Sequence, residues 1–375
     1  VITLFIIAYL RLQDGYLTEV IRLNSFDYLQ STDPIVQSKD VVIVELNESA
    51  VEQYGQWPWP RDVLADVVWK LREQGAGIIV MPILFSEPDS HGQDMTFIEN
   101  IAGNGVVIAQ VGTTQTNKNA VSRGVAKIGD PLPWLFEWPG MLGPIELFGI
   151  NADGVGVINI APEIDGVVRR MPTIMRVGEE TYPAMAVEAI RVAMGAPSYQ
   201  IKAWLRYNNT FETVSVTGDL SVVAGKTVVL GLTIEGVGST IATPKGTQYA
   251  HMPIAISLQS VFNGDNPTRT SMADFYELAF LIGIGLILIR GARFTPYWAI
   301  AGGMVVITAG TVYGATYVYS TYGLLFDFTM PTAGAVLVGL HAIFNRFVLE
   351  FRQKQEIKKQ FGGYASPTVV KMLQD

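Results

Sequence analysis

The chain has 375 residues, of which 49% are hydrophobic and 16% are charged, and its formal net charge is −8. This composition is too apolar for a wholly soluble protein and too rich in scattered acidic residues for a protein embedded in the membrane throughout. The negative charge disfavours binding to nucleic acid or to an anionic lipid surface. Because there is no cysteine, stability must come from a hydrophobic core rather than from disulfides.

The chain begins with an apolar run that stops at Arg11. This run is about half of the ~20 residues that a helix needs to span a bilayer. We expect residues 1–12 to be the outer end of a transmembrane helix that begins upstream. A cleaved signal peptide is the alternative, although no small-residue cleavage site follows Leu12. Apolar residues then recur with helical spacing from Leu17 to Leu29 and predict a second helix.

Residues 13–272 are expected to form one α/β domain outside the cytoplasm, because short apolar strands alternate there with amphipathic helical patterns. Residues 13–270 hold 28 acidic and 17 basic side chains. Strands are predicted at residues 41–46, 77–85, 106–111, 155–161, 167–177, 201–207 and 227–232, and helices at 63–73, 95–102, 185–194 and 254–262. The Asp165-Gly166 pair predicts a tight hairpin turn between two of these strands.

Three apolar spans follow, at residues 273–293, 296–319 and 322–345. Their lengths suit membrane-crossing helices, and the short links force an up-down-up arrangement. Arg290 and Arg293 lie at the end of the first of these spans, beside the link to the second, and six basic residues follow the last span, whereas the link between the second and third spans has none. Basic residues favour the cytoplasmic side, so the C-terminal tail is expected inside and the α/β domain outside. With residues 1–12, the spans predict a four-helix transmembrane bundle.

Some polar and small residues within the spans are candidates for a special role. Gly310 and Gly314 have the spacing that allows close helix contact, although glycine is common in membrane helices. Asp327, near the outer end of the last span, is expected either to take part in packing or coupling or to lie at the membrane interface. His91 and His251 are expected on the surface.

Several segments of the chain are similar to a known family of bacterial signalling receptors. They are Val42-Ile43-Val44-Glu45-Leu46-Asn47-Glu48-Ser49, Trp57-Pro58-Trp59-Pro60-Arg61, Ile83-Leu84-Phe85-Ser86-Glu87-Pro88-Asp89, Asp165-Gly166-Val167-Val168-Arg169-Arg170 and Tyr182-Pro183. Over most of residues 15–345 the chain resembles the second type of the cyclase/histidine-kinase-associated extracellular sensory domains. Such domains are typically followed by three transmembrane helices and a cytoplasmic output module. The resemblance implies a multi-pass protein of the bacterial inner membrane.

The resemblance also implies a signal site in the α/β domain. The candidates are Glu45, Asn47, Trp57, Trp59, Arg61, Glu87 and Asp89. Family members generally carry aspartate at the positions of Asn47 and Pro82, so we predict no metal site here. The two tryptophans fit core packing better than a sugar platform, and Arg169 and Arg170 fit a solvated strand face better than an anion site.

Residues 346–375 are expected to continue as a basic helix and then a linker in the cytoplasm. Phe344, Phe347 and Phe351 are spaced as in a weak heptad, which is compatible with a parallel coiled coil in a homodimer. The segment after the helix resembles the linker ahead of class III adenylate cyclase catalytic domains. Its glycines can end the helix, and its Ser-Pro pair can start another. We expect signal transmission through Phe361, Gly362, Gly363, Tyr364, Ser366 and Pro367.

No catalytic motif is found within residues 1–375, and no cofactor is predicted for them. The leading hypothesis is a membrane receptor for an extracytoplasmic signal, whose adenylate cyclase domain would follow Asp375 and make cyclic AMP from ATP. The family resemblance implies a homodimer in the lipid bilayer, an unidentified extracellular ligand or protein partner, and Mg or Mn in the catalytic domain. A sensor histidine kinase and a ligand-binding membrane scaffold without enzymatic output are the alternatives.

Overall fold

The computed structural model describes residues 2–115, 118–124, 132–198, 206–264 and 266–361. The chain divides into two compact units. Residues 33–268 form what we call the α/β domain, and residues 1–32 with 269–375 form what we call the helical unit. The helix α2 (Tyr16–Ser31) belongs to the helical unit, whereas the sequence analysis included it in the α/β domain.

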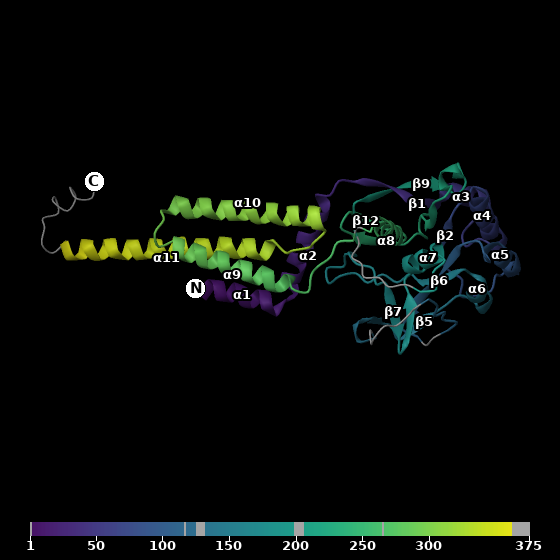
Figure 1. Ribbon diagram of the computed structural model, residues 1–375, viewed down its shortest axis with the longest axis horizontal. Helices are drawn as coiled ribbons and strands as arrows, with labels where there is room; N and C mark the ends of the chain where they lie inside the picture. Colours follow the sequence, from purple (N-terminus) through teal and green to yellow (C-terminus); the bar gives the residue numbers. More distant parts are fainter. Residues whose placement is uncertain (1, 116–117, 125–131, 199–205, 265, 362–375) are drawn as a thin grey trace. The chain divides into compact units, whose positions relative to one another are not determined.

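A seven-stranded sheet is the centre of the α/β domain (Figure 1). Its order is β5-β3-β2-β10-β1-β9, with β6 also paired to β3. All pairs are parallel except β3 with β5. The strands are β1 (Val36–Leu46), β2 (Ile78–Leu84), β3 (Val106–Thr113), β5 (Gly140–Leu142), β6 (Gly154–Val157), β9 (Asn209–Ser215) and β10 (Thr227–Leu232).

Helices cover both faces of this sheet, as a largely parallel sheet requires. Val42, Val44 and Leu46 of β1 pack into a core on one face, whereas Val41 and Ile43 pack into a core on the other. The first face is covered by α3 (Glu48–Tyr54), α4 (Arg61–Glu73), α5 (Asp94–Ile101) and α6 (Glu146–Asn151), and the second by α7 (Met185–Ala193) and α8 (Met252–Asn263). Burial on both faces explains the continuous apolar run at residues 41–44 of β1.

Smaller elements complete the α/β domain. They are a three-stranded sheet of β4 (Phe136–Glu137), β7 (Ile174–Val177) and β8 (Glu180–Pro183), a hairpin of β11 (Thr240–Thr243) and β12 (Gly246–Tyr249), and 3-10 turns at Leu132–Trp134 and Leu220–Val223. Of the strand predicted at residues 201–207, residues 201–205 lie outside the described residues.

The predicted hairpin at Asp165-Gly166 is wrong. Gly166 does form a turn with φ of +81°, but the next strand begins only at residue 174 and pairs with β8 and β4, whereas β6 pairs with β3. The carboxylate of Asp165 accepts hydrogen bonds of 2.8 and 2.7 Å from the guanidinium of Arg169, whose side chain is buried. This ion pair stabilises a folded loop, so Arg169 does not lie on a solvated strand face.

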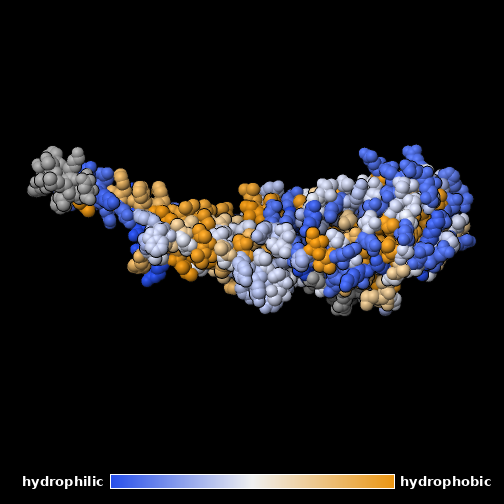
Figure 2. Space-filling model, turned by 90° about the horizontal axis from the view of Figure 1, so that it is seen from above, coloured by the Kyte–Doolittle hydropathy of each residue, from blue (hydrophilic) through white to orange (hydrophobic). Residues whose placement is uncertain are grey.

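The helical unit consists of α1 (Ile2–Gln13), α2, α9 (Ala273–Gly291), α10 (Tyr297–Tyr322) and α11 (Thr329–Phe361). Four of them run alongside one another and α2 lies across one end (Figure 1). Leu4 and Ile7 of α1, Leu281 of α9 and Val338 of α11 share a small core. Figure 2 shows hydrophobic side chains over most of this unit and hydrophilic ones over the α/β domain. By length and composition, α10 and α11 can each cross a membrane.

The last apolar span begins later than predicted. Residues 320 and 321, expected to be a link, are helical, and α10 ends at Tyr322, before Gly323, whose φ of +64° is left-handed. The chain is then non-helical until Thr329, where α11 starts. The intervening Leu324, Leu325 and Phe326 are apolar, so hydropathy alone could not separate this link from a membrane helix. Beyond it, α11 continues without a break to Phe361, as expected for the tail helix.

Candidate functional site

A cavity of about 540 Å³ opens in the α/β domain at the ends of β2 and β10. The sheet topology produces it, because β10 leads to α8 on one face whereas its neighbours β1 and β2 lead to helices on the other face. In open α/β sheets, ligands bind beyond the carboxyl ends of the strands where neighbouring connections diverge in this way. The position of the cavity therefore makes it the candidate signal site.

Two tryptophans form the aromatic side of this cavity. The rings of Trp57 and Trp59 meet edge to face, with 5.3 Å between their centroids. The indole N–H of Trp59 donates a hydrogen bond of 2.7 Å to the carbonyl of Gly55, and only 1% of this residue is exposed. Trp57 is half-buried. Trp59 is therefore a core residue, and Trp57 presents an aromatic surface to the cavity.

Arg61, the first residue of α4, supplies the positive charge of the cavity. Its guanidinium lies 4.7 Å from the centroid of the Phe85 ring and donates a 3.3 Å hydrogen bond to the carbonyl of Glu87. Its Nε lies 3.6 Å from a carboxylate oxygen of Asp94, and no hydrogen-bond partner for this nitrogen is found in the described part of the chain. Burial lowers the pKa of Arg61, against the opposing charges of Asp89 and Asp94.

Asp89 organises the loop after β2 rather than offering a free carboxylate. It accepts a 3.0 Å hydrogen bond from the amide of Gln93, and its own amide donates to the carboxylate of Asp94. Burial alone would raise the pKa of Asp89, but backbone hydrogen bonds from Gln93, His91 and Arg61, with the charge of Arg61, hold this pKa below its ordinary value. Asp89 is therefore an ionised structural residue beneath the loop.

The outer rim of the cavity is more open. Glu87 is exposed, and 64% of the His91 side chain is exposed. His91 lies on the surface as predicted, with its Nδ1 at 3.2 Å from the hydroxyl of Ser90. The cavity thus has an aromatic wall, one partly buried cation and an acidic rim. This combination suits a small polar molecule with an apolar part.

Two candidates from the sequence lie elsewhere. The side-chain oxygen of Asn47 accepts hydrogen bonds from the amide of Ala50, at 3.3 Å, and from the hydroxyl of Ser215, at 3.0 Å, so Asn47 caps α3. Glu45 is half-buried on the α8 face of the sheet, in register with Gly231 of β10, and burial raises its pKa. Five of the seven predicted site residues therefore line one cavity, and Glu45 and Asn47 do not.

The cavity wall also contains Pro82 of β2, one of the two positions at which family members generally carry aspartate. Leu232, the last residue of β10, lies in this wall too, and it was not predicted because it is an ordinary member of an apolar run in the sequence. His251 was expected on the surface, but it is only 6% exposed. Its ring covers Gly231 and stacks on Tyr249, with 5.8 Å between the centroids. The missing side chain at Gly231 is the sequence signal for this close approach.

The helical unit contains an ionic cluster that was not predicted; Arg11 and Glu277 are buried in it, whereas Asp274 is 65% exposed. Arg11 of α1 donates to Asp274 and Glu277 of α9, at 2.5 and 2.6 Å. Arg269 donates to the same two carboxylates, at 2.6 and 2.7 Å. The amide of Asp327 donates to Glu277 at 2.8 Å. Charges that flank apolar spans are the signal that could have suggested this cluster.

Other sequence-predicted residues have less defined surroundings. Gly310 and Gly314 line a second cavity, between α9, α10 and the start of α11, instead of packing against another helix of the described chain. Phe361 is the last residue of α11. Gly362, Gly363, Tyr364, Ser366 and Pro367 lie outside the described residues. Among the described residues, no group of histidine and acidic side chains is arranged to hold a metal ion.

Comparison with known proteins gives one match. The family model described as the CHASE2 domain matches residues 1–290 of this chain. No curated protein and no solved structure matches the chain.

Proposed function

Since the chain belongs to the family of CHASE2 domain proteins, we propose that it is the sensing and transmitting part of a membrane receptor that regulates a class III adenylate cyclase. The observation that carries the sensing role is the family match over residues 1–290, which contain the cavity at the ends of β2 and β10. A small extracytoplasmic ligand binds between Trp57 and Arg61. Binding shifts the loop that Asp89 organises.

Four membrane crossings, by α1, α9, α10 and α11, connect the sensor to the cytoplasm of a bacterial inner membrane. The apolar character of α10 and α11 supports two of the crossings. The shared core of α1, α9 and α11 supports the other two. Arg290, Arg293 and the basic residues after Phe344 support a cytoplasmic C-terminus, which puts the α/β domain outside.

The output passes through α11 of a homodimer. Phe344, Phe347 and Phe351 are 63, 59 and 54% exposed and recur every three or four residues, so each helix presents an apolar stripe that a second copy can cover. Class III cyclases form their active sites between two subunits and use Mg or Mn. The linker-like segment from Phe361 to Pro367 supports a cyclase rather than another output.

The test is production of cyclic AMP from ATP by the full-length gene product in membranes of a cyclase-deficient bacterium, with Mg or Mn and with GTP as a control substrate. We expect cyclic AMP. A histidine kinase would instead label itself with phosphate from ATP, and a scaffold would do neither. Either of these results, with intact protein in the membrane, would refute the proposed output.

The role of α11 is tested by insertions that rotate the part of the chain beyond them about the helix axis. One alanine inserted after Gln355 rotates all that follows by about 100°, whereas seven residues return it nearly to its original phase. The described residues around this point are exposed, so neither insertion disturbs a core of the described chain. We expect the single insertion to change the cyclase rate several-fold and the seven-residue insertion to retain it. Equal rates in the two variants would contradict transmission through a rigid helix.

A further inference from the structure

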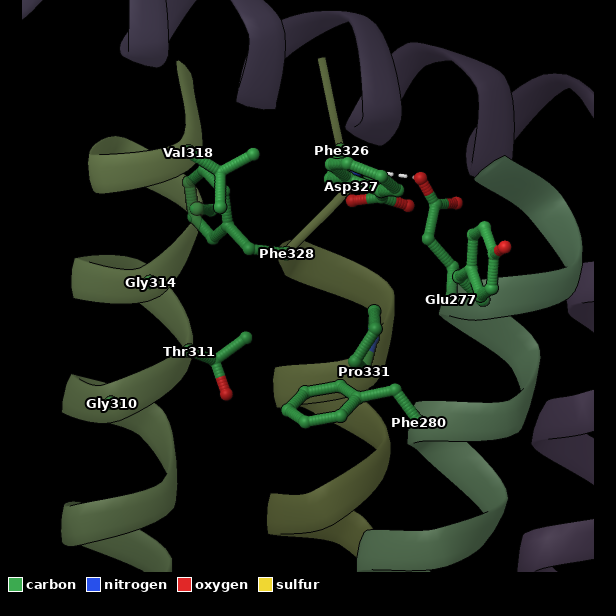
Figure 3. Close-up of a pocket in the computed structure, with 12 residues that line it drawn as sticks. Glu277, Phe280, Gly310, Thr311, Gly314, Val318, Phe326, Asp327, Phe328 and Pro331 are labelled. Carbon is green, nitrogen blue, oxygen red and sulfur yellow. Dashed lines mark hydrogen bonds between the residues drawn. The ribbon is translucent and has the colours of Figure 1, made fainter. Parts of the chain in front are cut away.

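The helical unit contains a cavity of about 400 Å³ that the proposed signal site does not use. It lies between α9, α10 and the link that precedes α11 (Figure 3). Its volume is within the range of small-molecule sites in proteins. A cavity of this size next to buried charges is a candidate ligand site.

The walls of this cavity are almost entirely apolar. Figure 3 shows the ring of Phe280 on α9 facing Thr311 on α10, with Val318, Phe328 and Pro331 around them. A Cβ built at Gly310 or Gly314 would meet no atom within 4 Å in the described part of the chain, so both glycines leave open space along α10. The cavity can therefore accept a flexible alkyl chain along this helix.

One corner of the cavity is polar, because the carboxylate of Asp327 lies there. One oxygen of this carboxylate accepts no hydrogen bond from the described residues. Asp327 is 2% exposed. Its Oδ1 accepts hydrogen bonds from the amide and the hydroxyl of Thr329, at 2.8 and 2.5 Å. Its Oδ2 is buried, and within the described residues no group donates to it. Glu277, beside it in Figure 3, has donors on both oxygens. Leaving a buried acceptor unpaired is destabilising, so a donor is expected there.

The ion pairs around Asp327 indicate which donor it lacks. The neighbouring arginines, Arg11, Arg22 and Arg269, are each paired with carboxylates other than Asp327. Among the described residues, none of them forms an ion pair with Asp327. A positively charged donor would give this buried carboxylate its missing partner, whereas an anionic headgroup would repel it. The shape of the cavity and the charge of Asp327 therefore favour a ligand with an alkyl chain that ends in an ammonium group.

From these observations we propose that the helical unit binds a single-chain lipophilic amine. The alkyl chain lies along Gly310 and Gly314, and the ammonium N–H donates to Oδ2 of Asp327. This site is independent of the cavity in the α/β domain and of the nature of the output. Binding joins α9, α10 and the link before α11, so the ligand stabilises one arrangement of these three segments.

The test is equilibrium binding of radiolabelled dodecylamine to the full chain in phosphatidylcholine nanodiscs, with empty nanodiscs as the background. Dodecyltrimethylammonium has the same charge and no N–H, and lauric acid has the opposite charge. We expect saturable binding of the amine, at least tenfold weaker binding of the trimethyl compound, and none of the acid. Equal binding of the two cations, or amine binding no greater than in empty nanodiscs, would refute the site.

Two variants locate the site. Asp327→Asn keeps the size of the side chain but removes the charge, and we expect at least a tenfold loss of amine affinity. Gly314→Leu fills the cavity while Asp327 stays, and we expect it to abolish binding. Gly302→Leu is the matched control, because Gly302 lies on the same helix, has equally open surroundings and does not line the cavity. If Gly314→Leu binds the amine as well as Gly302→Leu does, the proposal is wrong. This readout does not depend on cyclic AMP.

Discussion

Buried titratable side chains determine how single residues in the α/β domain respond to pH. His251 is 6% exposed, and burial lowers its pKa to about 4 from an ordinary value of 6.5. Its ring fits against Gly231, where a Cβ would approach it to 2.6 Å. The backbone register places Glu45 beside Gly231 on the same face. The neutral imidazole is therefore part of the packing.

The pH dependence of folding follows from this burial. Because the folded state holds His251 neutral and the unfolded state protonates it, its effect is absent above about pH 6.5 and lowers stability as the pH falls towards 4. We expect a loss of about 2 kcal/mol at pH 5 relative to pH 7.5. Thermal unfolding of the full chain at the two pH values measures it. His251→Gln should reduce this pH dependence, whereas the exposed His91→Gln should not. Identical pH profiles in both variants would contradict the assignment.

The sequence predicted individual residues unevenly. The family resemblance supplied the candidates Trp57, Trp59, Arg61, Glu87 and Asp89, and these five line one cavity, whereas Glu45 and Asn47 do not. His251 could not be placed, because its burial depends on the absence of a side chain at Gly231, twenty residues earlier. Spatial partners of this kind leave no local pattern in a single sequence.

At the scale of elements, the ionic cluster connects α1, α9 and the link before α11. Glu277 is central to it, because its carboxylate accepts from Arg11, from Arg269 and from the amide of Asp327, and its side chain is 3% exposed. Arg11 and Arg269 therefore share one buried carboxylate, whereas their other shared partner, Asp274, is 65% exposed. Without Glu277, the buried Arg11 keeps only exposed partners, and removing one partner of a buried ion pair is strongly destabilising.

We expect Glu277→Gln to destabilise the helical unit by about 3–5 kcal/mol. Thermal unfolding of the full chain in detergent micelles measures the change. Glu350→Gln is the matched control, because Glu350 pairs with Arg346 one turn away on an exposed part of α11, and it should leave stability unchanged. A similar shift in both variants would mean that the cluster contributes nothing beyond a surface ion pair.

Helices and strands whose residues follow one clear hydrophobic pattern were predicted best. The strand at Thr227–Leu232 was predicted with its observed bounds, and the bounds of α4, α5 and α7 were predicted within two residues. A strand buried on both faces gives a continuous apolar run, and a helix buried along one stripe gives a helical period, so both can be recognised in the sequence. Of the strand predicted at residues 167–177, only residues 174–177 form one, as β7, since Arg169 and Asp165 pair across a loop in which apolar residues resemble a strand. The position of the link after Gly323 was not predicted, because this link is as apolar as the helices that it joins.

At the scale of the whole molecule, each unit has its own core. Both hydrophobic cores of the sheet lie within residues 33–268, and the core of α1, α9 and α11 lies within the helical unit. Few sequence features mark the boundary at Thr32, because α2 and β1 follow each other closely and both carry apolar residues. The boundary between the two units is therefore visible in the packing of the structure, but not in the composition of the sequence.

We expect residues 33–268 to fold alone, without a membrane, because their cores need no contribution from the helical unit. Circular dichroism should show mixed α and β structure with one cooperative thermal transition. A fragment of residues 33–224 is the control, since it lacks β10 and α8 and should not fold. An unfolded 33–268 fragment would show that the helical unit is required for the stability of the domain.

The place of β10 in the sheet also governs the order in which the domain can be assembled during synthesis. β1 and β2 leave the ribosome early, yet neither can pair with the other, because the strand between them is Thr227–Leu232. Their facing backbone edges must stay unpaired until more than two hundred residues have been made. Unpaired strand edges aggregate readily. The nascent chain therefore exposes two unpaired strand edges for most of its synthesis, and only the arrival of β10 closes the sheet.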